Sequence, residues 1–106
     1  MKYFELFTDY NSMIEQWNPN PNPPTDEQIL FAYYSYEDYS GWAICIFERD
    51  GVLYEVHDAH CSCYGLENWK PEETSWEALS IRDYSSLGGE PLTAFKALVF
   101  SRLGLK

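Results

Sequence analysis

The chain of 106 residues carries 17 Asp and Glu against 7 Lys and Arg, which gives a formal net charge of −10. Its length suits one hydrophobic core, and no apolar run approaches the roughly 20 residues that a membrane-spanning helix needs. Hydrophobic residues make up 45% of the chain and aromatic residues 18%, too many for a disordered acidic tail. The acidic excess also disfavours direct binding to nucleic acid, which requires Lys and Arg to neutralise phosphates. Composition therefore predicts a soluble, acidic, folded domain.

Cysteine content indicates the compartment. Three cysteines leave at least one thiol without a disulfide partner, and the N-terminus lacks the charged-then-apolar layout of a signal peptide. We therefore expect a reducing compartment, the cytoplasm of a cell.

The first element expected is an N-terminal helix over residues 1–17, with a break near Thr8 to Asn11, where turn formers gather. Its apolar side chains recur at spacings of three and four, as in Tyr3, Leu6, Phe7, Tyr10, Met13, Ile14 and Trp17. Residues 18–24 contain four prolines, which remove backbone donors and disfavour helix. A stiff, extended connector is therefore expected between this helix and the sheet and C-terminal helices of residues 25–106.

Three strands are expected next. Residues 29–36 are rich in aromatic side chains, residues 37–41 form a turn, and residues 42–48 and 52–57 follow as two further strands. Asp50-Gly51 joins the last two and is the strongest local hairpin signal in the chain. With a two-residue loop there, both faces of the hairpin carry large apolar groups, so we expect both faces of the sheet to be covered.

Two helices are expected to close the chain. Thr74 and Glu77 have the spacing of a capping box that begins a short helix. Pro91 suits the first turn of a last helix, and Gly104 suits its end. The fold class predicted is thus α+β, a single domain with an antiparallel meander of three or four strands, an N-terminal helix and two C-terminal helices.

Aromatic and acidic residues are interleaved at the end of the first predicted strand. The group comprises Tyr34, Tyr36, Glu37, Asp38, Tyr39 and Trp42. Exposed Tyr and Trp bring large contact area at low entropic cost, and acids beside them favour a basic protein surface. The alternative is that these rings fill the core of a small domain. Both interpretations remain open at this level.

A second polar cluster contains two imidazoles and two thiols, in His57, His60, Cys61 and Cys63. This ligand set suits tetrahedral zinc, although four ligands within seven residues would require one segment to wrap around the ion. A catalytic thiolate is the other interpretation, but His57 and His60 are the only histidines, and catalytic partners usually come from separate segments. A zinc centre is therefore the alternative prediction for this segment.

About half of the chain resembles a group of small phage and prophage proteins of unknown function. The resemblance lies in Tyr33–Gly41 (YYSYEDYSG), Asp50–Val56 (DGVLYEV), His60–Glu67 (HCSCYGLE) and Trp69–Thr74 (WKPEET). It implies a phage origin, and hence the cytoplasm of a bacterial host, but no reaction.

The function predicted from these observations is non-enzymatic. We expect the chain to bind and inhibit or modulate a basic host protein, such as a nucleic-acid-binding defence effector of the CRISPR or restriction type. The partner-binding residues would be those of the aromatic and acidic group. The alternatives are a small zinc-binding domain and a protein that sequesters nucleotides. An exposed edge strand would also allow a homodimer.

Overall fold

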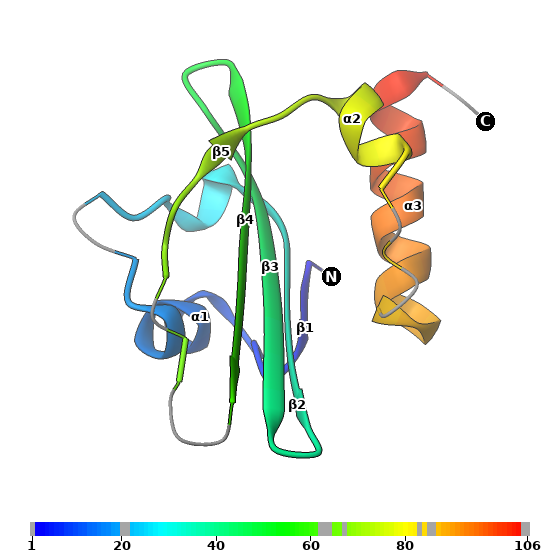
Figure 1. Cartoon of the computed structure of the whole chain (residues 1–106). Coiled ribbons are helices and arrows are strands. Elements are labelled where there is room, and N and C mark those ends of the chain that lie inside the picture. Colours follow the sequence, from blue (N-terminus) through cyan, green and yellow to red (C-terminus); the bar gives the residue numbers. More distant parts are fainter. Residues whose placement is uncertain are drawn as a thin grey trace. The chain divides into compact units, whose positions relative to one another are not determined.

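The computed structural model describes residues 2–19, 22–61, 65–66, 68–82, 84 and 87–104. The chain forms two compact units, Met1–Glu73 and Thr74–Lys106. The described part of the first unit contains a sheet with one α-helix and a short 3-10 helix, and that of the second contains two α-helices (Figure 1). The predicted α+β class is confirmed.

The sheet has five strands in the order β1-β2-β3-β4-β5. Their bounds are β1 Tyr3–Glu5, β2 Ile29–Glu37, β3 Ser40–Arg49, β4 Val52–Cys61 and β5 Glu72–Glu73. Strand β1 runs parallel to β2, whereas the other neighbours are antiparallel. The predicted meander corresponds to β2-β3-β4, so the prediction of three or four strands was an undercount. The two additional strands are edge strands of three and two residues, too short to leave a sequence pattern.

The hairpin predicted at Asp50-Gly51 is confirmed. Arg49 pairs with Val52, so the loop has two residues, and both loop residues have positive φ, 53° and 77°. This is the backbone that a two-residue hairpin loop favours, because its twist matches that of the strands. Strand β4 then continues to Cys61, four residues beyond the predicted end.

Helix α1 (Tyr10–Trp17) covers only the second half of the predicted N-terminal helix. Asp9 caps it, accepting a hydrogen bond from the backbone N–H of Ser12 at 2.8 Å. The residues before the cap form β1 instead of helix, with Tyr3 paired to Ala32. The parallel pairing of these residues with β2, which is distant in sequence, outweighs the helical spacing of their apolar side chains. The chain therefore builds a strand–helix–strand crossover, which parallel neighbours require.

One face of the sheet and α1 share a hydrophobic core. Its buried members are Phe7, Met13, Trp17, Ile29, Ala32, Tyr34, Ala43, Cys45, Phe47, Val56 and Leu66. Large side chains on the opposite face are also buried, namely Phe4, Phe31, Tyr33, Ile44, Ile46 and Leu53. Both faces are thus apolar and buried, as the alternation in β3 and β4 predicted.

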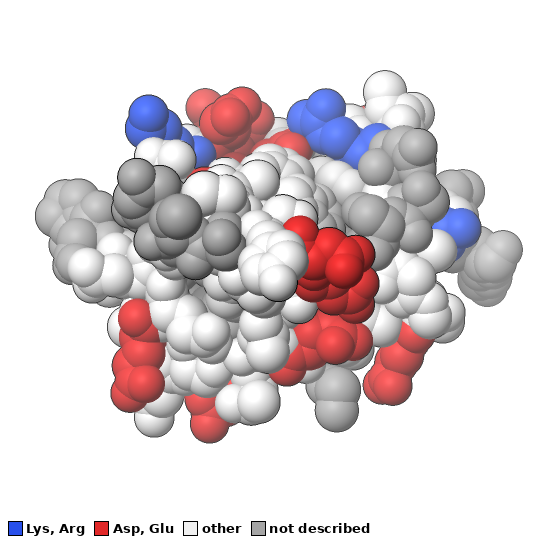
Figure 2. All heavy atoms as spheres, turned by 60° about the horizontal axis from the view of Figure 1, so that its bottom comes forward, with Lys and Arg blue, Asp and Glu red and all other residues white. Residues whose placement is uncertain are grey.

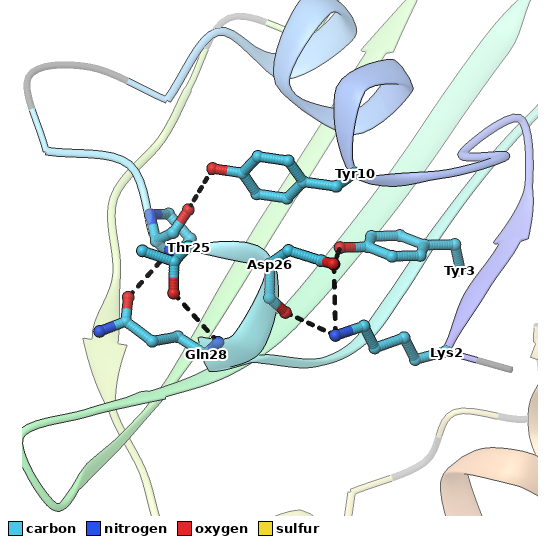
Figure 3. Close-up of polar contacts among 7 residues, drawn as sticks. Lys2, Tyr3, Tyr10, Thr25, Asp26 and Gln28 are labelled. Atoms are coloured by element: carbon cyan, nitrogen blue, oxygen red, sulfur yellow. Dashed lines mark hydrogen bonds and ion pairs between the residues drawn. The ribbon is translucent and has the colours of Figure 1, made fainter.

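The proline-rich connector ends in a short 3-10 helix, η1 (Asp26–Gln28), which is tied to the N-terminal strand (Figure 3). The Asp26 carboxylate accepts from the Tyr3 hydroxyl at 2.5 Å and pairs with Lys2 Nζ at 3.3 Å. These contacts lower the pKa of Asp26, the hydrogen bond from Tyr3 most of all. Burial, and then the bond to Asp26, raises the pKa of Tyr3 well above its usual range.

One further contact joins the end of the connector to α1, and a second stabilises η1 itself (Figure 3). The hydroxyl of Tyr10 on α1 donates to the carbonyl of Pro24 at 2.7 Å. Thr25 and Gln28 form a reciprocal capping box around η1. Pro24 is therefore held against α1, and Asp26 of η1 against the N-terminal strand.

The second unit consists of α2 (Trp76–Ser80) and α3 (Gly89–Leu103). The cap of α2 is Ser75, whose hydroxyl accepts from the N–H of Ala78 at 3.1 Å. The prediction of Thr74 as the cap was wrong by one residue, and the buried Thr74 hydroxyl has no hydrogen-bond partner among the described residues. Helix α3 ends as predicted at Gly104, which has a left-handed φ of 78°.

Candidate binding surface at the β2–β3 turn

The turn between β2 and β3 has an unusual backbone for its sequence. Glu37 pairs with Ser40, so Asp38 and Tyr39 form a two-residue loop, and both have positive φ, 52° and 66°. Asp50-Gly51 has the same geometry with glycine in second place. Left-handed backbone costs a non-glycine residue about 1–2 kcal/mol, and bulky residues rarely adopt it. The sequence gives no glycine signal for this turn, which explains why residues 37–41 were predicted only as a longer turn.

Side chains at this turn combine aromatic rings with acids. Tyr39 is 78% exposed and Tyr36 41% exposed, and Glu37 and Asp38 between them are also exposed. Figure 2 brings this end of the structure forward and shows acidic side chains next to uncharged ones near the middle of the face. We call these four residues, Tyr36 to Tyr39, the turn surface.

A histidine lies behind the turn surface. The Nδ1 atom of His60 is 2.7 Å from the carbonyl oxygen of Cys61, and its Nε2 atom is 2.5 Å from the hydroxyl of Tyr34. A carbonyl oxygen only accepts, so Nδ1 carries a proton, and in the neutral form of the ring Nε2 then accepts from the Tyr34 hydroxyl. Both ring nitrogens are thus occupied by hydrogen bonds. Burial raises the pKa of the Tyr34 phenol, and the charges of Tyr36 and Asp58 act in the same direction.

Gly41 makes room for this histidine. It pairs with Tyr36 on one side and with His60 on the other. A Cβ atom added at Gly41 would lie 2.3 Å from His60 Nε2, far inside contact distance. With no side chain between them, the Tyr36 and His60 rings approach to 5.6 Å between centroids. Gly41 and His60 therefore support the Tyr36 ring from below.

The predicted partner-binding residues divide into two sets. The turn surface brings four of them together. Tyr34 lies beneath it and is only 6% exposed. Trp42 is half-buried and faces the other side of the sheet, where it packs on Tyr33 at 5.7 Å between centroids. The alternation of side chains along the strand correctly placed Tyr34 and Tyr36 on one face. It predicted neither the burial of Tyr34 nor the role of His60.

The predicted zinc ligands do not converge within the described residues. His57 and His60 are three apart on β4, so they point to opposite faces. His57 Nε2 is 2.6 Å from an oxygen of the buried Glu55, and Cys61 is exposed on the face away from His60. Cys63 lies outside the described residues. Among the residues that the structure describes, no group of three or more His, Cys, Asp and Glu could hold a metal ion.

Comparison of the chain with protein-family models, curated proteins and solved structures finds no match. In the described part of the chain, no helix has the length and apolarity needed to cross a membrane.

Proposed function

We propose that the chain is a non-enzymatic binding protein that docks its turn surface onto a basic surface of a partner protein. The observation that carries the proposal is Tyr39, which keeps a left-handed backbone and a 78% exposed ring where glycine would relieve the strain. Strained backbone is retained where it serves a function. An exposed tyrosine beside acids suits an anchor in a charged interface.

Charge supports a basic partner. The first unit carries fourteen acidic and three basic side chains. Two of the three bases are engaged within the unit, since Lys2 pairs with Asp26, and Arg49 donates to the carbonyl of Asn22 at 3.2 Å. The net field of this unit would attract a basic protein surface and speed the encounter. The resemblance to phage proteins makes a bacterial nucleic-acid-binding effector the partner class to test first.

The experiment is affinity capture from nuclease-treated bacterial lysate with matched variants. Glu37→Gln with Asp38→Asn removes two acids from the turn surface, and Asn tolerates the left-handed backbone of residue 38. Glu72→Gln with Glu73→Gln removes two exposed acids from β5 and is the control of equal net charge. We expect the turn variant to lose a partner that the wild-type chain and the control both retain.

Two results would contradict the proposal. If both double variants lose the partner equally, binding follows net charge and not the turn surface. If neither variant loses it, and Tyr39→Gly also retains it, the partner contacts another part of the chain.

A further inference from the structure

Helices α2 and α3 line a partly open cavity of about 210 Å³ within the second unit. Its floor is apolar and buried, and is formed by Leu79, Tyr84, Phe95 and Val99. The Tyr84 and Phe95 rings meet edge to face with their centroids 4.8 Å apart. The floor is therefore a surface on which a flat apolar group can pack.

Two cations lie at the rim of this cavity. Arg82 follows α2, Lys96 is on α3, and both are exposed. The second unit as a whole carries four basic and three acidic side chains, in contrast to the strongly acidic first unit. An anionic group is thus attracted to this cavity, although the whole chain is negative.

We infer that the cavity binds a small amphiphile, with an apolar body of about one aromatic ring in the cavity and a carboxylate at Lys96. Its volume is somewhat larger than the roughly 150 Å³ of an apolar cavity that holds benzene. A ring with a short chain and one carboxylate matches both the volume and the charge. This site is separate from the turn surface and does not depend on the function proposed there.

The test is a titration of the ¹⁵N-labelled full chain with 3-phenylpropionate, followed by NMR, with the neutral 3-phenylpropanamide as the matched ligand. Ligands of this size typically bind with dissociation constants of about 1 mM. We expect saturable shifts in the amides of α2 and α3. We also expect the carboxylate to bind up to about fivefold more tightly than the amide, the range of an exposed ion pair.

Matched variants identify the cavity as the site. Lys96→Gln should reduce the affinity for the carboxylate to that for the amide. Arg102→Gln removes the same charge from α3 but lies over the Trp76 ring, outside the cavity lining, and should change neither affinity. Leu92→Trp, at a lining position, should fill the cavity and weaken both ligands.

Three outcomes would overturn the inference. The first is the absence of saturable shifts in α2 and α3 for either ligand. The second is an equal effect of Lys96→Gln and Arg102→Gln. The third is a shift of the same amides with protein concentration alone, because a second copy of the chain would then occupy the cavity.

Discussion

Replacing Tyr39 by glycine should stabilise the fold. In the present structure Tyr39 has a φ of 66°, which costs an L-residue about 1–2 kcal/mol. Glycine removes that strain but gains about 0.5–1 kcal/mol of conformational freedom in the unfolded chain. Because the Tyr39 side chain is 78% exposed, little burial is lost. The net gain in unfolding free energy is therefore roughly 0.5–1 kcal/mol.

The other hairpin provides the reciprocal control. Gly51 holds the same turn position with a φ of 77°, and nothing lies within 4 Å of a Cβ atom built there. Gly51→Tyr should therefore introduce strain without a clash and lower the unfolding free energy by roughly 1 kcal/mol. The two substitutions exchange the same residue types between two turns of equal length, so their effects should have opposite signs.

Urea unfolding followed by tryptophan fluorescence measures both effects. In a thermal melt of a chain of this size, a gain of about 0.7 kcal/mol in unfolding free energy corresponds to a rise in Tm of roughly 3–5 °C. A loss of more than about 0.5 kcal/mol in Tyr39→Gly would refute the reasoning, since the ring would then contribute more to stability than the turn costs. If the variant is more stable but no longer captures the partner, Tyr39 contributes to binding at a cost in stability.

Three further substitutions, one of them with a matched control, probe the contacts behind the turn and around η1. Gly41→Ala should lower the unfolding free energy by roughly 1–3 kcal/mol, because its Cβ would meet His60 at 2.3 Å. The control is Gly65→Ala, where nothing lies within 4 Å of the added Cβ. Its unfolding free energy should stay within about 0.5 kcal/mol of the wild-type value in the same urea assay. Tyr34→Phe removes the hydrogen bond to His60 Nε2 and should cost about 0.5–1.5 kcal/mol, whereas an unchanged midpoint would show that the bond contributes nothing. The pKa of Asp26 is lowered in the folded state, so its stabilisation is present above the unfolded pKa of about 3.9 and is lost as pH falls through the lower, folded value. Asp26→Asn should thus be less stable than the wild-type chain at pH 7, and this difference should narrow as pH falls below about 3.9; a difference that stays constant would contradict that linkage.

Elements defined by local chemistry could be predicted from the sequence. Asp50-Gly51 specifies its turn because glycine tolerates positive φ, and Pro91 and Gly104 delimit α3 because each suits one end of a helix. In each case the deciding interaction lies within a few residues. The strand at Tyr3–Glu5 could not be predicted in this way, because its partner lies in β2 beyond α1 and the connector.

The turn surface was predicted only in part for a related reason. Alternation along β2 assigned Tyr34 and Tyr36 to the same face, but it carries no information on which ring a neighbour covers. That depends on His60, from a different strand, which reaches Tyr34 across Gly41. No local pattern marks Asp38-Tyr39 as a two-residue loop either, because the glycine that usually signals one is absent.

The parallel edge strand has a consequence for the order in which the sheet opens. Strands β2, β3 and β4 are joined by two-residue loops, whereas β1 pairs with β2 only across α1 and the connector, from residue 3 to residue 32. Contacts over such long loops form late and are lost first. The amide protons of Leu6 and Ala32, whose bonds join these two strands, should therefore exchange with solvent sooner than those of β3. In that partly open state the outer edge of β2 is uncovered, so β1 protects the sheet against pairing with other chains.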